Sequence, residues 1–437
     1  MEIREFVLLA VLLAAPVACQ SRAAEDVPAP AAGFAAGAFG MPPGPAIAEP
    51  RGTLREECAQ RRRELARRLG PGVIWIETPQ GVELERFFQE DNFYYLSGVE
   101  LPDIALALRV DEAGALQDEV LFLPPYDSNF EVWNGKRLSP GAEAEEATGF
   151  RSTAPLEARA KVLAAWAPKQ VWSLGQPTTT LPQGSLVDTD RVRDELAAMR
   201  LVKSDYEQDC LRAAIDITGA SLLRAAAMVR PGASEYEPQG ALEGSFLQFG
   251  AERPGFASIF GSGPNSVTLH YNANRRAMQD GDLIVMDVGA KYRYYCADVT
   301  RTVPVSGKFT ERQRQVYDLV LAAQAKAAAA AKPGVTMAAL DGIARQVIVD
   351  GGFGPGRTYF KHGLGHWIGL DVHDVGAPNT PITAGMLFTI EPGIYIADEG
   401  LGVRIEDDYL MTEQGAVKLS TTFPSDPDAI EALMRRP

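Results

Sequence analysis

Cysteine, histidine and positive charge are scarce in this chain. Its 437 residues include four cysteines, four histidines and 42 Lys or Arg residues against 57 acidic residues, giving a formal net charge of -15. Because nucleic-acid binding needs a basic surface, this balance argues against DNA or RNA as a partner. Cys58, Cys210 and Cys296 are odd in number and lack metal-type spacing, so we expect buried free thiols rather than a disulfide framework.

Long apolar runs are absent from the interior of the sequence, which argues against an internal membrane-spanning helix. At the N-terminus, residues 1–18 contain an apolar stretch with the length of a signal-sequence core, followed by Cys19. We therefore expect an exported protein, periplasmic or anchored to a membrane by lipid on Cys19. The alternative is a cytoplasmic protein with a misassigned start. Residues 19–52 are rich in Ala, Pro and Gly, which predicts a disordered tether.

Residues 53–198 alternate helix and strand signals, which predicts an α/β domain. Apolar runs at residues 73–76, 104–108 and 120–123 are typical of buried strands. The one basic run precedes them. It contains Arg61, Arg62, Arg63, Arg67 and Arg68. We interpret this run as the solvated face of a helix that ends at Gly70.

Residues 199–425 repeat one scheme of elements. Ser204 and Thr310 each begin a capping-box helix, each helix stops at a Pro-Gly pair, and a second helix and strands follow. The second helices are expected to open at Ser234 and Thr336. Two such units predict two similar halves that face one another, with a site between them. Residues 426–437 are expected to be a C-terminal tail.

Five metal-capable side chains follow or flank apolar, strand-like runs in this region. They are Asp287, Asp298, His366, Glu391 and Glu406. Buried ionised carboxylates are unfavourable unless they are paired or bound to a metal, and clustered carboxylates repel one another. Two divalent ions bring four positive charges, which balance four carboxylates beside one neutral imidazole. This composition predicts a two-metal hydrolytic centre, in which ions about 3.5–4 Å apart share a bridging water that serves as the hydroxide nucleophile.

Three of the four histidines fall within twelve residues. His362, His366 and His373 share a glycine-rich segment, and His270 stands apart. This concentration favours a functional role over scattered, merely solvated histidines. A carboxylate-rich site with one imidazole suits Mn²⁺, with Co²⁺ or Zn²⁺ also possible. A Ca²⁺ site is the alternative, but no loop has EF-hand spacing. Arg404 alternates with Glu406, so it is expected to orient a carboxylate of the site.

These residues lie in segments that resemble the pita-bread metallopeptidases, the family that contains methionine aminopeptidases, aminopeptidase P and prolidase. The matching segments are residues 270–271, 286–290, 298–302, 366–374, 389–395 and 402–407. Residues 86–98 and 131–137 resemble the creatinase-type N-terminal domain of aminopeptidase P, which methionine aminopeptidases lack. The resemblance implies an α/β (α+β) chain, with a creatinase-type N-terminal domain at residues 53–198 and a pseudo-twofold pita-bread catalytic domain at residues 199–425.

The resemblance also implies roles for individual residues. Asp287, Asp298, His366, Glu391 and Glu406 would hold two metal ions, and Glu391 would also move the proton of the nucleophilic water. His270, His362 and His373 would surround the scissile carbonyl, while Tyr271, Arg404, Tyr395 and Trp133 would contact the substrate or support the site.

The expected substrate is a peptide with proline at its second position, and the expected enzyme is an Xaa-Pro aminopeptidase. Prolidase, which cleaves only Xaa-Pro dipeptides, is the rival interpretation. A catalytically silent peptide-binding protein of the same fold is the third, although such relatives usually lose metal ligands. The family resemblance also leads us to expect a homo-oligomer, a dimer or a tetramer.

Overall fold

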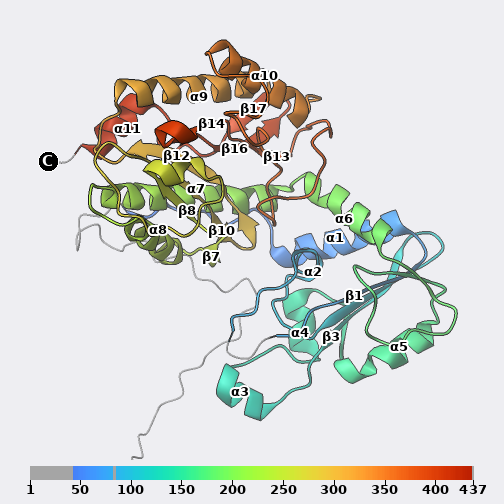
Figure 1. The fold of residues 1–437 in the computed structure, drawn as a ribbon. Coiled ribbons are helices and arrows are strands. Elements are labelled where there is room, and N and C mark those ends of the chain that lie inside the picture. Colours follow the sequence, from blue (N-terminus) through green and yellow to red (C-terminus); the bar gives the residue numbers. More distant parts are fainter. Residues whose placement is uncertain (1–42, 82–84, 436–437) are drawn as a thin grey trace, which may run out of the picture.

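The computed structural model describes residues 43–81 and 85–435, which form the two domains seen in Figure 1. The predicted fold class is confirmed: an N-terminal α/β domain is followed by a mixed domain with the pita-bread arrangement. Residues 1–18, Cys19 and most of the predicted tether lie outside the described residues. No helix in the described part of the chain is long and apolar enough to cross a bilayer.

The N-terminal domain is built on a mixed sheet with the strand order β4-β3-β2-β1-β5-β6. Its strands are β1 (Gly72–Glu77), β2 (Ala105–Val110), β3 (Leu116–Leu123), β4 (Ser152–Pro155), β5 (Gln170–Trp172) and β6 (Leu186–Asp188). Its helices are α1 (Leu54–Leu69), α2 (Asp91–Ser97), α3 (Ser128–Asn134), α4 (Ala142–Thr148), α5 (Arg159–Trp166) and α6 (Asp190–Leu201). The strands alternate apolar residues between two faces: Trp75 packs with Leu163 of α5 on one face, and Ile74 belongs to the larger core on the other. All three predicted strands are confirmed.

The interpretation of the basic run is wrong for two of its five arginines. Helix α1 does end before Gly70, but Arg61 and Arg62 are buried. The Arg62 guanidinium pairs with Glu119 at 2.8 Å, and Arg61 lies 3.5 Å from Glu207 of the catalytic domain. Helix α1 packs between the sheet and the catalytic domain, so acids distant in sequence neutralise charges that a local pattern assigns to solvent.

The catalytic domain repeats a pair of helices followed by strands. Its helices are α7 (Asp205–Met228), α8 (Tyr236–Gln248), α9 (Glu311–Ala330), α10 (Met337–Asp350) and α11 (Pro427–Met434). The capping boxes at Ser204 and Thr310 are confirmed, and Thr336 caps α10. Helix α8 begins at Tyr236, two residues after the expected Ser234, without a side-chain cap. In Figure 1, α9 and α10 lie at the top of this domain and α7 and α8 in its lower part, with β12, β14 and β16 between α9 and α7.

The strands of the catalytic domain form several small antiparallel sheets between the helix pairs. They are β7 (Arg253–Pro254), β8 (Ile259–Ser262), β9 (Leu283–Val288), β10 (Ala290–Tyr292), β11 (Tyr295–Cys296), β12 (Val299–Pro304), β13 (Leu387–Ile390), β14 (Gly393–Ile396), β15 (Leu401–Arg404), β16 (Asp407–Thr412) and β17 (Gly415–Lys418). The first half contributes the order β12-β9-β8 and the second half β13-β16-β17. Glu391 stands at the break between β13 and β14, and Glu406 stands at the break between β15 and β16.

Both ends of the described chain pack on the catalytic domain, contrary to the expected tether and tail. Pro50 is buried, Ile47 packs against the core, and Glu49 pairs with Arg293 at 2.8 Å. Residues 43–50 are therefore not free linker. Helix α11 lies within the predicted tail and buries Ile430 completely. Apolar side chains spaced along these short segments supply contacts that a compositional bias does not reveal.

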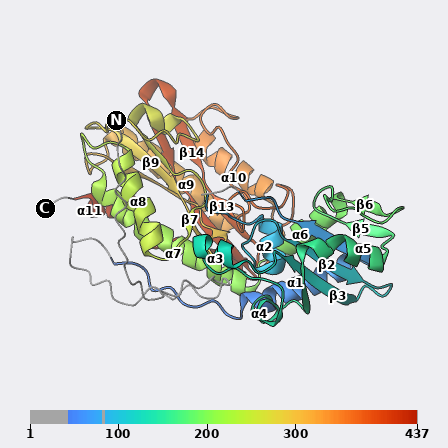
Figure 2. The ribbon, with the colours of Figure 1, turned by 90° about the horizontal axis from the view of Figure 1, so that it is seen from below.

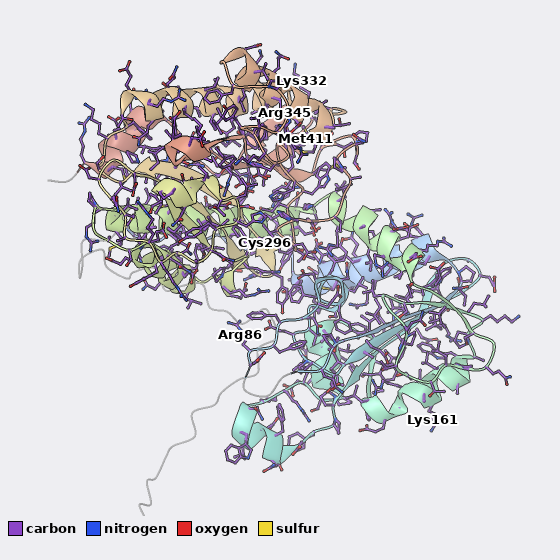
Figure 3. The ribbon with its side chains drawn as sticks, viewed as in Figure 1. Arg86, Lys161, Cys296, Lys332, Arg345 and Met411 are labelled. Atoms are coloured by element: carbon purple, nitrogen blue, oxygen red, sulfur yellow. The ribbon has the colours of Figure 1, made fainter. Side chains whose placement is uncertain are left out.

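The two domains meet beside one end of α7, and α6 leads from one to the other (Figure 2). The contact is chemically specific. The Tyr294 ring of the β10–β11 turn stacks on Tyr94 of α2, with centroids 3.7 Å apart, and its hydroxyl accepts from the Gln89 backbone at 2.8 Å. Cys296, labelled in Figure 3, follows in β11 and is buried, as are Cys58 and Cys210. The expectation of buried free thiols is confirmed for these three.

Candidate metal centre and active-site cavity

The four metal-capable carboxylates stand at or beside the ends of strands, and the histidine stands on a loop. Asp287 is the fifth residue of β9, and Asp298 directly precedes β12, its antiparallel neighbour. Glu391 follows β13, and Glu406 lies between β15 and β16. His366 is held on a loop by two hydrogen bonds with Thr389. The Thr389 amide donates to the His366 carbonyl at 2.9 Å, and the His366 amide donates to the Thr389 hydroxyl at 3.1 Å. The first half of the domain thus supplies two carboxylates, and the second half supplies the remainder.

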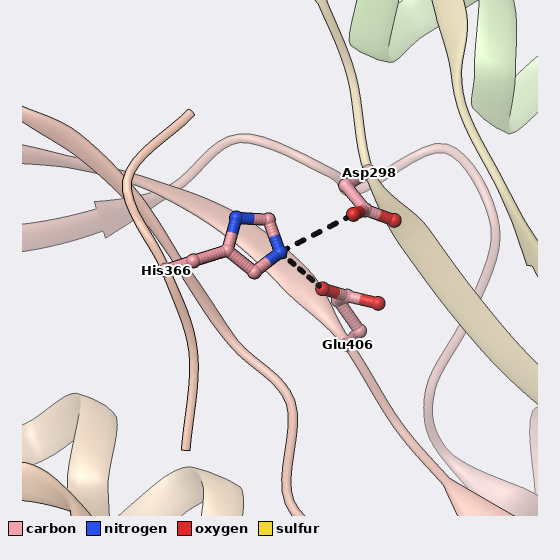
Figure 4. Close-up of side chains that lie close together, drawn as sticks. All are labelled: Asp298, His366 and Glu406. Atoms are coloured by element: carbon pink, nitrogen blue, oxygen red, sulfur yellow. Dashed lines mark ion pairs between the residues drawn. The ribbon is translucent and has the colours of Figure 1, made fainter. Parts of the chain in front are cut away.

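The five side chains converge on one point. His366 Nε2 lies 3.4 Å from Asp298, 3.7 Å from Glu391 and 3.8 Å from Glu406. Ligand atoms of Asp298, His366 and Glu406 all lie within 4.8 Å of one another. Figure 4 shows the His366 ring directed between the two carboxylates. Asp287 lines the same cavity.

Unpartnered oxygens test whether these residues fit metal ions. Asp287, Asp298 and Glu406 each keep one buried carboxylate oxygen without a hydrogen-bond partner among the described residues. An unsatisfied buried carboxylate is strongly unfavourable, and a divalent cation is the ligand that satisfies several at once. The donor set of four carboxylates and one imidazole therefore fits two divalent ions.

The electrostatics of the site agree with this fit. Burial, and next the charge of Glu406, raise the pKa of Asp298 well above its ordinary value. Burial and the Glu406 charge likewise raise the pKa of Glu391, and burial with the Asp287 charge raises the pKa of Glu406 to about 8. Without cations these acids therefore share protons instead of remaining ionised together.

The histidine of the centre is oriented for metal binding. His366 Nδ1 lies 3.0 Å from the Trp367 carbonyl, which can only accept a hydrogen bond, so Nδ1 carries the proton and Nε2 keeps its lone pair. Burial lowers the pKa of His366 to about 4, so the ring is neutral near pH 7. A neutral imidazole with its free nitrogen turned toward the carboxylates is the form that ligates a metal.

Arg404 and Tyr395 support the centre from the side of Asp287. The Arg404 guanidinium donates to Asp287 and, at 2.8 Å, to the Tyr395 hydroxyl. That hydroxyl also lies 2.7 Å from His362 Nε2. Burial and then the Arg404 charge lower the pKa of His362 to about 3, so this ring is neutral as well. Arg404 orients a carboxylate, as expected, and Tyr395 links it to a histidine of the cavity.

A cavity of about 480 Å³ opens over the five ligand residues. It is also lined by His270, His362 and His373, so the predicted histidines are brought together around the centre. The His373 and His366 rings meet edge to face, with centroids 4.3 Å apart. The remaining wall includes apolar side chains that sequence reasoning had not named. They are Phe256, Ala257, Ile259, Leu269 and Val372.

Three residues expected to contact the substrate or support the site do not line this cavity. The Tyr271 hydroxyl donates to Glu235 at 2.8 Å. Trp133 lies on α3 of the N-terminal domain with its side chain exposed. Tyr395 is buried behind His362 and reaches the cavity only through its contacts. A substrate role for Trp133 stays a prediction.

Three further residues hold the site and were missed by sequence reasoning. Thr300 donates to Glu406 at 2.7 Å; its position two residues after Asp298 in a strand was a usable signal. Glu235 accepts from Ser262 and Tyr271, and thereby fixes the chain on both sides of His270. Arg200 binds two acids that flank His373. Neither Glu235 nor Arg200 belongs to any local pattern, so only the fold reveals them.

Comparison with known proteins agrees with this geometry. Residues 209–413 match metallopeptidase family M24, and residues 58–172 match the aminopeptidase P N-terminal domain. The Xaa-Pro aminopeptidase of Escherichia coli strain K12 is 33% identical, in an alignment that covers 87% of this chain and 98% of the relative. The Xaa-Pro dipeptidase of Pyrococcus horikoshii is 39% identical over 55% of this chain and 68% of the relative.

Solved structures show the same two-domain arrangement. Escherichia coli aminopeptidase P, as a variant in complex with substrate, superimposes with a TM-score of 0.81 and 31% identity, covering 88% of this chain and 99% of that one. A zinc-substituted form of that enzyme in complex with product gives the same TM-score over 89% of this chain and 99% of that one. Proline aminopeptidase P II from Yersinia pestis gives a TM-score of 0.80 at 32% identity, covering 87% of this chain and 99% of that one.

Proposed function

Because the chain belongs to metallopeptidase family M24 and carries the aminopeptidase P N-terminal domain, we propose that it is an Xaa-Pro aminopeptidase. It would remove the first residue from peptides whose second residue is proline. One observation carries this proposal: four carboxylates and a neutral imidazole converge in a cavity, and three of the carboxylates leave a buried oxygen unpartnered. A non-catalytic binding protein would have no need to retain so unfavourable a cluster.

The metal ligands would be Asp287, Asp298, His366, Glu391 and Glu406. When bound, two divalent ions supply Lewis acidity toward the scissile carbonyl and a nucleophilic water near neutral pH. The high proportion of carboxylate oxygen favours Mn²⁺, with Co²⁺ or Zn²⁺ able to occupy the same donors.

Glu391 is the proposed proton carrier. Its carboxyl lines the cavity beside the other proposed ligands, where it would accept the proton of the attacking water and hold it. The same carboxyl would then donate that proton to the proline nitrogen as the peptide bond breaks. An unprotonated amide nitrogen is a poor leaving group, so proton delivery to the proline nitrogen is a requirement of the reaction.

The histidines and the apolar wall would recognise the rest of the substrate. His270 and His373 face the cavity and can donate to the oxyanion of the tetrahedral intermediate or to the peptide backbone. His362 lines the cavity with both ring nitrogens engaged, by the Gly363 carbonyl and the Tyr395 hydroxyl, so it would shape the substrate site through contact. Phe256, Ile259 and neighbouring apolar residues offer a dry surface of the kind that accommodates a proline ring.

A second candidate activity is that of an Xaa-Pro dipeptidase. It is favoured by the 39% identity between this chain and a dipeptidase over about half its length. The two activities are distinguished by comparing kcat/KM for Xaa-Pro-Xaa tripeptides with kcat/KM for the matching Xaa-Pro dipeptides. Faster turnover of the tripeptides supports the aminopeptidase. Exclusive turnover of the dipeptides would replace it with the second candidate.

The cellular setting is also proposed. We infer that the leader at residues 1–18 exports the chain and that Cys19 receives lipid, which makes the enzyme periplasmic or membrane-anchored. Fractionation of cells that produce the protein, with a Cys19→Ser variant as control, tests this inference. We also propose a homo-oligomer, a dimer or a tetramer. Val132 and Trp133 are exposed side by side on α3, and a subunit contact would remove them from water.

A further inference from the structure

We propose that Arg200 is a positioning residue for His373, fixing the loop that carries this histidine from the helix that joins the two domains. The inference rests on the proposed function, in which His373 acts on the substrate. It extends that function by giving the N-terminal domain a part in shaping the active site.

The imidazole of His373 has little to hold it directly. It projects into the cavity, and among the described residues its ring contacts His366 but makes no hydrogen bond. Its location is therefore set by the backbone of residues 369–374. Whatever fixes that backbone also fixes the position of the ring.

Arg200 binds this segment through two acids, Asp371 before His373 and Asp374 after it. One guanidinium nitrogen lies 2.8 Å from Asp371 and 2.6 Å from Asp374. Lys203 approaches the other oxygen of Asp374 at 3.0 Å. The side chains of Arg200 and Asp374 are 3% and 1% exposed, so the pair is shielded from water and held in one geometry.

The same segment is closed from its other sides by backbone contacts. The Asp374 amide donates to the Trp367 carbonyl at 2.9 Å, and the Cys296 amide donates to the Gly369 carbonyl at 2.8 Å. Lys291 donates to the Leu370 carbonyl at 2.9 Å. A side chain at Gly369 would begin 2.0 Å from the Asp374 carboxylate, so this position has room only for glycine while Asp374 stays in place.

The N-terminal domain takes part through α2. Arg200 also donates to the Asn92 side chain at 2.8 Å, and Asp91 lies 3.3 Å from Lys291 while bonding to Asp371. Arg200 thus joins three parts of the molecule: α2, the linker helix α6 and the His373 loop. A displacement of about 1 Å at a catalytic group can lower a rate by about 100-fold. Greater mobility of the His373 loop would therefore lower kcat.

The test is a double-mutant cycle between Arg200 and His373. Arg200→Lys keeps the charge but has one nitrogen in place of two, so it cannot hold Asn92 together with both acids in the same geometry. We expect it to lower kcat on an Xaa-Pro-Xaa tripeptide by about tenfold, with KM and bound metal unchanged. In a His373→Ala background the same substitution should change kcat by less than about twofold, because the residue being positioned is gone.

Matched variants separate positioning from general damage. Arg193→Lys makes the same exchange on the same helix, where Arg193 is exposed and contacts Asp190 and the Leu174 carbonyl, both far from His373 in the N-terminal domain; it should leave kcat unchanged. Asp371→Asn weakens the same grip at a half-exposed carboxylate and should lower kcat by a smaller factor, again only when His373 is present. It serves if Arg200→Lys does not fold. A kcat loss of equal size with and without His373, or a loss of bound metal, overturns the inference.

A second readout does not depend on peptidase activity. The chain has only four histidines, so their ring signals in NMR spectra of the zinc-loaded, histidine-labelled protein can be assigned by substitution. Arg200→Lys should shift or broaden the His373 signal and leave the His270 signal in place. Unchanged His373 signals would refute the positioning role. If the wild-type protein cleaves no Xaa-Pro-Xaa peptide and the His373 signal still moves, the proposed function fails while the positioning role stands.

Discussion

Glu406 and Asp407 are neighbours in sequence and are both buried, but their side chains face opposite sides of the site and have different partners. Glu406 faces the cavity, where Thr300 is its only hydrogen-bond donor and one oxygen has no partner among the described residues. Asp407 faces the back of the site, where both of its oxygens are matched. Its partners are Arg301, Lys418, Ser420 and Gln324.

The contrast shows how the protein separates binding from stability. On the back side, protein cations neutralise the carboxylate completely, and the network holds the strands in place. On the cavity side, Arg404 reaches one oxygen of Asp287, and Asp298, Glu406 and the second Asp287 oxygen are left short of partners, so a ligand must supply the missing positive charge. A buried acid without its own cation is therefore the feature that indicates a binding site here.

Removal of metal should give the largest effect, because it removes the charge that the cavity side needs. Exhaustive chelation is expected to abolish hydrolysis of an Xaa-Pro-Xaa peptide, and added Mn²⁺ should restore it. Metal loading should also raise the unfolding midpoint, since the ions bind only the folded state. Activity that survives chelation, with metal analysis confirming an empty protein, would contradict the metal centre.

Neutralising the two neighbours separately should sharpen the contrast. Asp407→Asn leaves Arg301 and Lys418 without their counter-charge and should lower the free energy of unfolding by about 3 kcal/mol. Glu406→Gln should change the metal-free protein by less than about 0.5 kcal/mol, because the raised pKa of Glu406 already keeps it largely protonated at pH 7. Denaturant unfolding of both variants without metal measures the difference. Equal losses would erase the distinction between the two sides.

Among the acids of the cavity, Glu391 is expected to affect kcat through proton transfer as well as through metal binding. Glu391→Gln cannot carry a proton and should lower kcat by about 100-fold or more, which corresponds to about 2.7 kcal/mol. Metal content must be measured alongside, because Glu391 is also a proposed ligand. A variant that binds metal and retains near-normal kcat would remove the proton-transfer role.

The last and smallest change in wild-type behaviour is expected at Asp91. This carboxyl has an ion-pair partner, Lys291, but is not fully paired like Asp407. Burial and then its hydrogen bond with Asp371 raise the pKa of Asp91 to about 7, although Lys291 is near. The folded state thus binds a proton that the unfolded state releases near pH 4, and stability falls as pH rises from about 4 to 7.

Asp91→Asn removes that proton-linked loss. The variant should gain stability relative to the wild type as pH rises through this window, by about 1 kcal/mol, because the lowered pKa of Asp371 offsets part of the shift. Thermal unfolding at pH 5 and pH 8 provides the comparison, with the exposed Asp190→Asn as control. A stability difference that does not change with pH would show that the pair shares no proton.

Much of this arrangement could be predicted from sequence because it is encoded locally. Capping boxes fix helix starts, and apolar runs that end in Asp287 or Glu391 reveal both a strand and a ligand. The five ligands could be grouped because clustered acids beside buried strands require a common explanation.

The remainder depends on contacts between residues far apart in the chain. Arg61 and Arg62 were assigned to solvent because their partners, Glu207 and Glu119, lie on other elements. The same holds for Arg200, which finds Asp371 and Asp374 only after the domains have packed. A charge pattern gives the sign of a surface, whereas burial of a charge is decided by the tertiary fold.

The division of ligands between the halves of the catalytic domain bears on how the enzyme obtains its ions. Asp287 and Asp298 precede α9, while His366, Glu391 and Glu406 follow it, so neither half holds a complete set. Ion capture must wait until the chain has been synthesised through Glu406 and the halves have closed. For a chain threaded across a membrane unfolded, the choice of metal would be made by the ion supply outside the cytoplasm.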